Sequence, residues 1–76
     1  MDISDTIEYE VVSAFGHLNK GDGIGSSDIT EVVRNVIMTE NGVDIFDTPD
    51  TIDSKYIHTI RMMVHTVTTN FLNEVA

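Results

Sequence analysis

Residues 56–75 read YIHTIRMMVHTVTTNFLNEV, and the spacing of the apolar side chains in this stretch decides the fold. Apolar residues recur every three or four positions, which places them on one face of an α-helix. This stripe consists of Tyr56, Ile57, Ile60, Met63, Val64, Val67, Phe71 and Val75. A helix of about 20 residues extends about 30 Å. We therefore predict a long amphipathic helix that starts between about Asp50 and Asp53, ends near Asn73 and needs other helices to cover its apolar face.

Two shorter segments before this stretch have the same helical period. The first covers about residues 4 to 18, and its apolar positions are Ile7, Val11, Ala14, Phe15 and Leu18. The second runs from about residue 26 to Glu40, and its apolar positions are Ile29, Val32, Val33, Val36 and Ile37. Each segment is therefore predicted to be an amphipathic helix that packs against the long one.

The second helix has start and stop signals of its own. Its start is marked by three residue types that favour N-caps, Ser26, Ser27 and Asp28. Asp28 followed by Glu31 predicts a capping box. Asn41 and Gly42 suit a left-handed C-cap, although the same pair could also turn a β-hairpin between the apolar residues on either side. We favour the helix because a half-buried strand needs a longer alternation of apolar and polar residues.

Polar segments connect the three predicted helices. Residues 19–25 contain three of the five Gly, which adopt turn conformations at low cost, so this segment is predicted to be a tight turn. Residues 43–53 contain the single Pro and are predicted to form a loop, in which Ile45 and Phe46 act as apolar plugs.

Length bounds the architecture. A chain of 76 residues forms one domain, residues 1–76, and without Cys it has no disulfide framework. The three periods predict an all-α fold, a hairpin-like bundle of three helices that pairs into a homodimer. The third helix is longer than the other two, so the end of its stripe, Val67, Phe71 and Val75, is the predicted dimer interface. In the alternative, this helix frays after Val67, because Thr66, Thr68 and Thr69 lower helix propensity.

The charge balance indicates the class of partner. Thirteen Asp and Glu against four Lys and Arg give a formal charge of −9, which repels nucleic acid and anionic membranes. A protein with a basic surface is therefore the expected partner, and the alternative is a merely solvated acidic loop. The residues predicted to contact this partner are Asp44, Asp47, Asp50 and Asp53. We expect a cytoplasmic location, because no apolar run approaches a membrane span and Met1 to Asp5 is acidic where a signal peptide would be basic.

Catalytic and metal-binding patterns are weak. His58 and His65 are about 10 Å apart on a helix, too far to share one metal ion, and they are expected to be exposed. The Asp series lacks the ligand spacing of a calcium loop. A small three-helix chain also offers little concavity for an activated nucleophile. We expect no catalytic residue, no metal and no cofactor, so the protein is not expected to be an enzyme.

Ser26 supports one alternative. The segment Gly23-Ile24-Gly25-Ser26-Ser27 opens a helix after a Gly-rich turn and resembles the phosphopantetheine-bearing Ser of acyl carrier proteins, and residues 42–45 resemble the segment after their second helix. The loop before Ser26 is shorter than in that family, and no Asp directly precedes this Ser. The resemblance implies a carrier protein with Ser26 as its cofactor-binding residue, whereas helix capping is the simpler role.

A second resemblance covers residues 6 to 70. Gly21-Asp22 with Ile24, Ser27-Asp28-Ile29, and Tyr56-Ile57 with Val64 and Thr66 resemble the YmgB/AriR and Bdm type connector proteins, small enterobacterial regulators of biofilm formation and acid resistance. The acidic insert at residues 44 to 53 is longer than in that family. The resemblance implies a non-enzymatic helical homodimer that modulates signalling or transcription control through protein contacts in a stress response. A phage or mobile-element inhibitor protein with an acidic surface is the other alternative.

Overall fold

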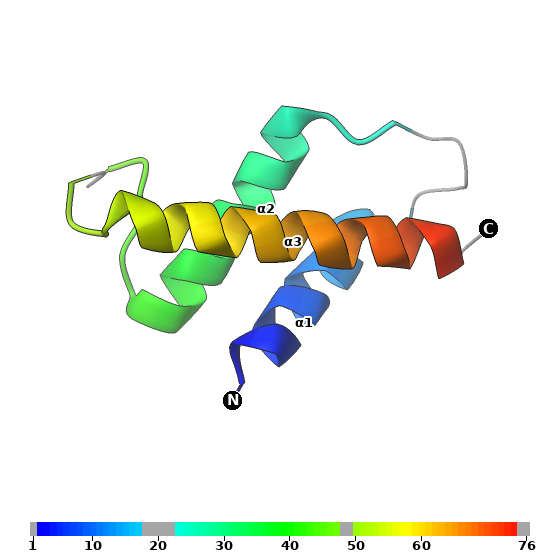
Figure 1. Cartoon of the computed structure of the whole chain (residues 1–76), viewed down its shortest axis with the longest axis horizontal. Helices are drawn as coiled ribbons and strands as arrows, with labels where there is room; N and C mark the ends of the chain where they lie inside the picture. Colours follow the sequence, from blue (N-terminus) through cyan, green and yellow to red (C-terminus); the bar gives the residue numbers. More distant parts are fainter. Residues whose placement is uncertain (1, 18–22, 48–49, 75–76) are drawn as a thin grey trace.

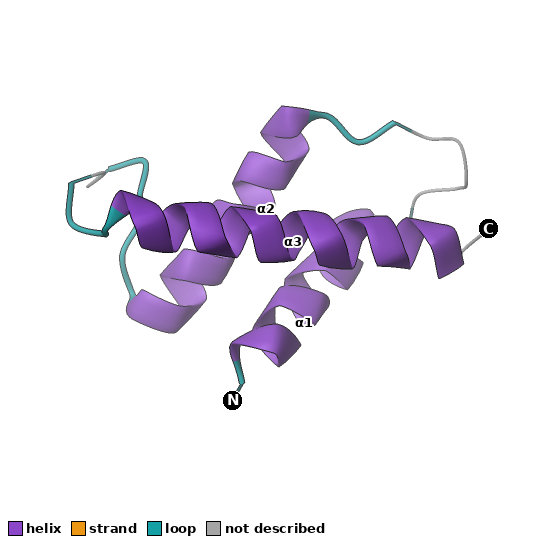
Figure 2. Cartoon of the chain, viewed as in Figure 1, coloured by secondary structure: helices purple, strands orange, loops and turns teal. Residues whose placement is uncertain are grey.

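Three α-helices and no strand make up the part of the chain that the computed structural model describes, residues 2–17, 23–47 and 50–74 (Figure 2). The helices are α1 (Ile3–Phe15), α2 (Ser26–Asn41) and α3 (Ser54–Glu74). All three pairs of helices are in contact, and Figure 1 shows α3 crossing both others, with α2 behind its first half and α1 behind its second half. The predicted all-α three-helix architecture is confirmed.

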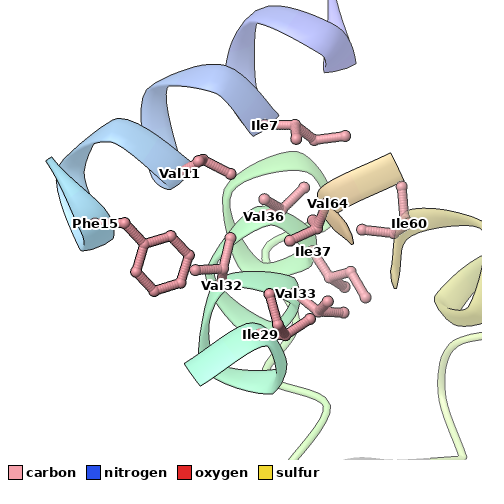
Figure 3. Packing of buried hydrophobic residues seen from close by; sticks show 10 residues of the cluster. All are labelled: Ile7, Val11, Phe15, Ile29, Val32, Val33, Val36, Ile37, Ile60 and Val64. Carbon is pink, nitrogen blue, oxygen red and sulfur yellow. The ribbon is translucent and has the colours of Figure 1, made fainter. Parts of the chain in front are cut away.

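The core lies where the three apolar faces meet (Figure 3). α2 contributes five of the ten buried hydrophobic residues. The buried set is Ile7, Val11, Phe15, Ile29, Val32, Val33, Val36, Ile37, Ile60 and Val64. Every one of these residues belongs to a predicted stripe, so the helical period identified the core correctly.

The start of α2 differs from the predicted cap. Gly25 is the N-cap, with extended backbone, and its N–H donates to the Asp28 carboxylate (N to Oδ2 2.9 Å). Asp28 is therefore the third helical residue and reaches back to the cap, while Ser26 and Ser27 are the first two helical residues and are exposed. The predicted N-cap at Ser26 to Asp28 and the predicted Asp28–Glu31 capping box are wrong. The helix begins at Ser26, so Asp28 already lies within its first turn.

The end of α2 follows the prediction. Gly42 has φ 70°, and its N–H donates to the Met38 carbonyl oxygen at 2.8 Å. This left-handed conformation suits Gly, which has no Cβ to clash. The Asn41 side chain donates to the Ile37 carbonyl oxygen (3.2 Å) and to the Tyr56 hydroxyl (3.1 Å), which ties the end of α2 to the start of α3. The β-hairpin alternative is wrong.

α1 is shorter than predicted. It begins at Ile3 and ends at Phe15, where the N–H of Gly16 donates to the Val12 carbonyl oxygen (2.8 Å). Gly has low helix propensity, which is consistent with a helix end here. Leu18, the last predicted apolar position of this helix, lies outside the described residues.

α3 is continuous to Glu74, so the alternative in which it frays after Val67 is wrong. Thr66 lies inside the helix, and its hydroxyl donates to the Met62 carbonyl oxygen (3.0 Å), one turn earlier. Packing against α1 overrides the low propensity of the Thr residues. None of the helices in the described ranges combines the length and apolar character that crossing a membrane requires.

Candidate functional site

The acidic loop, residues 43–53, holds its first Asp against the body of the protein. The Asp44 carboxylate accepts two hydrogen bonds from Arg34, from Nε at 2.8 Å and from Nη2 at 2.6 Å, and a third from the Phe46 N–H at 3.0 Å. The Arg34 guanidinium also lies over the Phe46 ring, 4.3 Å from its centroid. Asp44 and Phe46 are therefore fixed by one cation from α2.

This contact changes the ionisation of both side chains. The hydrogen bonds from Arg34, followed by the one from the Phe46 backbone, lower the pKa of Asp44 below its usual value. In the opposite direction, the hydrogen bond to Asp44 raises the pKa of Arg34. The charge of Asp44 is thus stabilised inside the chain by a two-pronged Arg contact.

The remaining predicted partner-binding residues have different surroundings. Asp53 caps α3, because its carboxylate accepts the Lys55 N–H at 2.9 Å. Asp47 and Asp50 are exposed. The two predicted plug residues differ in burial. Ile45 packs against the core, whereas the Phe46 side chain is 50% exposed. Phe46 as a core plug is therefore wrong: its ring stacks with Arg34 at the surface.

A groove of about 540 Å³ lies between α1 and the second half of α3. We call it the α1–α3 groove. Its lining residues are Glu8, Tyr9, Val11 and Val12 from α1, and Val67, Asn70, Phe71 and Glu74 from α3. Val11 is fully buried, Val67 and Phe71 are half-buried against the core, and Tyr9 and Val12 are 69% and 52% exposed. Apolar side chains from both helices therefore line the groove, and those of Tyr9 and Val12 are in contact with solvent.

The apolar surface continues along α3. Met62, Met63 and Thr66 form a shallow hollow together with Val67, which also lines the α1–α3 groove. Met62 is 56% exposed. Groove and hollow together follow α3 from Met62 to Glu74, a length of about 18 Å at 1.5 Å per residue.

The charges around the α1–α3 groove have one sign. α1 contains Asp5, Glu8 and Glu10, and residues 62–74 contain Glu74, while neither segment contains Lys or Arg. Arg61, in the first half of α3 and next to Met62, donates to the Thr30 hydroxyl of α2 (3.0 Å). The two charged residues that line the groove, Glu8 and Glu74, are therefore both acidic.

The predicted dimer residues lie in this groove. Val67 and Phe71 line it, and Val75 lies outside the described residues. α1 covers part of the stripe that was predicted to remain uncovered, because α1 crosses the second half of α3 (Figure 1). The homodimer itself stays a prediction.

Sequence reasoning missed the α1–α3 groove. The residues that expose most of its apolar surface, Tyr9 and Val12, lie outside the stripe of α1 and were not assigned a role. The sequence does contain an indication of this groove, because Tyr9 and Val12 are large apolar side chains among the polar positions of an amphipathic helix.

Ser26 lines a separate hollow of about 340 Å³, together with Ile24, Gly25, Ile29, Arg61, Met62 and His65. His58 and His65 are both exposed, as predicted. Within the described ranges, no three His, Cys, Asp or Glu residues are grouped to hold a metal ion. A phosphopantetheine group on Ser26 stays an alternative to the predicted unmodified hydroxyl.

Comparison with known proteins finds no matching family model, no similar curated protein and no similar solved structure. The two family resemblances therefore stay predictions, and the α1–α3 groove is the feature from which function is argued.

Proposed function

We propose that this protein is a small cytoplasmic regulator without catalytic activity that acts by binding another protein in the α1–α3 groove. The observation that carries the proposal is the exposure of Tyr9 (69%) and Val12 (52%) beside the half-buried Phe71. These exposed apolar side chains lie next to one another in a groove, and this is the surface on which we place the partner.

The energetics favour a protein as the occupant. Covering apolar surface contributes about 25 cal/mol per Å², and aromatic side chains such as Tyr dominate the energy of many protein interfaces. Tyr9 can bury its ring against a partner while its hydroxyl stays near water. The acidic walls, with Glu8 and Glu74, favour a partner that is basic around its apolar contact.

The acidic loop has a narrower role in partner binding than its four Asp residues predict. Asp44 and Asp53 already accept hydrogen bonds within the chain, so Asp47 and Asp50 are the loop carboxylates left to attract a basic partner. We propose that these two carboxylates attract a basic partner over a distance more than they contact it directly.

The resemblance of residues 6 to 70 to the YmgB/AriR and Bdm type connector proteins supports a regulatory role in a stress or biofilm response. A phage or mobile-element inhibitor would use the same acidic, partly apolar surface. The predicted homodimer would place a second copy over Val67 and Phe71, and it therefore competes with a partner for the α1–α3 groove.

The test is capture of host proteins with three versions of the chain, followed by affinity measurement with each purified partner. Tyr9→Ala/Val12→Ala removes apolar surface from the groove without lowering helix propensity. Met38→Ala, at a position 38% exposed on α2 and outside the groove, is the matched control. We expect a partner whose affinity falls at least tenfold for the groove variant and less than twofold for the control. Equal affinity of every captured protein for all three versions would refute the proposal.

A further inference from the structure

We infer that the occupant of the α1–α3 groove is an amphipathic helix of the partner, with Lys or Arg flanking its apolar anchors, and not a second copy of this chain. This inference rests on the proposed function and specifies the chemical class of the partner.

The groove favours a partner segment whose backbone N–H and C=O groups are already hydrogen-bonded to each other, as they are in a helix. Half of the residues that line the groove, Val11, Val12, Val67 and Phe71, have side chains without hydrogen-bonding groups. An inserted loop would leave backbone N–H and C=O groups without partners, at a cost that a helix avoids. The described residues form no strand, so among them there is no sheet edge onto which an extended peptide could add.

The length of the surface also fits a helix. The α3 residues that line the groove and the adjoining hollow recur at helical spacing from Met62 to Glu74. Anchors seven residues apart on a partner helix lie about 10 Å apart. One anchor can contact Tyr9, Val12 and Phe71, while the next contacts Met63. Such anchors at helical spacing are the usual basis of helix-in-groove recognition.

Charge separates a basic partner from a second copy. The acidic residues that line the groove are Glu8 and Glu74, and neither α1 nor residues 62–74 supply a Lys or Arg in return. A second copy that paired through this surface would bring the same carboxylates against them, whereas a basic helix would neutralise them. The two occupants respond to salt in opposite ways, since screening weakens attraction to a basic helix and relieves repulsion between two acidic copies.

The test uses two synthetic peptides of about 15 residues, the length at which isolated helices become stable. Both have Leu at helical spacing, and the flanking positions are Lys in one and Glu in the other. Each is titrated into the ¹⁵N-labelled full chain and followed by NMR. We expect the Lys peptide to shift the amide signals of Tyr9, Val12 and Phe71 and to bind at least tenfold more tightly than the Glu peptide.

Two double variants of equal charge separate a specific groove from general attraction to an acidic protein. Glu8→Gln/Glu74→Gln changes the groove walls, and Asp47→Asn/Asp50→Asn changes the acidic loop. Exposed ion pairs are individually weak, so we expect about a fivefold loss of Lys-peptide affinity for the first variant and less than twofold for the second. Equal losses would overturn the inference.

Three further outcomes would overturn it while leaving the proposed function in place. The first is equal affinity for the two peptides in the groove. The second is the absence of any peptide effect on Tyr9, Val12 and Phe71 while a captured protein still requires Tyr9 and Val12. The third is a homodimer, detected by sedimentation, that strengthens with salt and blocks the peptide. The proposed function itself fails only if no captured protein depends on the groove.

Discussion

The acidic loop and the α1–α3 groove are the two regions that we propose for partner binding. They differ in how many of their polar and apolar groups already make contacts within the chain. In the loop, Asp44 and Asp53 accept hydrogen bonds from Arg34 and from the start of α3. In the groove, Tyr9 and Val12 remain in water. A series of charges in a sequence therefore overstates the surface available for binding, because capping and pairing consume charges locally. We expect apolar residues outside the packed stripe to be the better indicator of a binding surface.

The largest expected effect is on the free energy of unfolding. It distinguishes Phe71, a groove residue that supports the fold, from Tyr9, a groove residue that is exposed. Phe71→Ala removes a half-buried ring that packs against the core, so we expect a loss of about 2 kcal/mol in the free energy of unfolding. Tyr9→Ala removes an exposed ring and should change this free energy by less than about 0.5 kcal/mol. Urea unfolding of the two variants measures both values. A loss for Tyr9→Ala as large as that for Phe71→Ala would show that Tyr9 belongs to the core.

A smaller effect is expected at Thr68, which is 4% exposed in the half of α3 that forms the groove. Its buried hydroxyl has no hydrogen-bond partner among the described residues. Thr68→Val replaces that hydroxyl with a methyl group of similar size, so we expect a gain of about 1 kcal/mol in the free energy of unfolding. Thr66→Val, at an exposed position whose hydroxyl bonds to Met62, is the control and should give no gain. Lower stability of Thr68→Val would contradict the absence of a partner.

The smallest effect is the pH dependence of the Arg34–Asp44 contact. Because the folded pKa of Asp44 lies below its unfolded value of about 3.9, the contact stabilises the fold above that pH. This contribution is lost as the pH falls through the folded pKa. We expect the stability difference between wild type and Asp44→Asn to be present at pH 6 and to shrink below pH 4, as followed by urea unfolding. Asp50→Asn controls for the loss of one negative charge. A difference that stayed constant down to pH 2 would contradict the role of Arg34.

The helical period was sufficient to predict the three helices and their buried faces, because periodicity records which side chains must avoid water. Ile29 to Ile37 in α2 is the clearest case, since all five predicted positions are buried. The left-handed cap at Gly42 was also predictable, because few residues tolerate that conformation. The N-cap of α2 is Gly25, just before the predicted Ser26 to Asp28. The prediction failed because three adjacent residues were all of types that favour N-caps.

The site was less predictable because it depends on how the helices cross. Tyr9 of α1 and Phe71 of α3 are far apart in the sequence, and only their packing places them in one groove. The contact between Arg34 and Asp44 also joins two elements that sequence reasoning treated separately. Tertiary packing likewise keeps α3 helical through its Thr residues, which local propensity disfavours.

The placement of the two Tyr residues gives the protein an intrinsic optical reporter. The chain contains no Trp, so its ultraviolet fluorescence comes from Tyr9, at the groove, and from Tyr56, whose hydroxyl is bonded to Asn41 at the junction of α2 and α3. In Tyr56→Phe, the emission would arise from Tyr9 alone. Occupation of the groove could then be followed in real time without an attached dye, and any partner lacking Trp and Tyr would leave that signal uncontaminated.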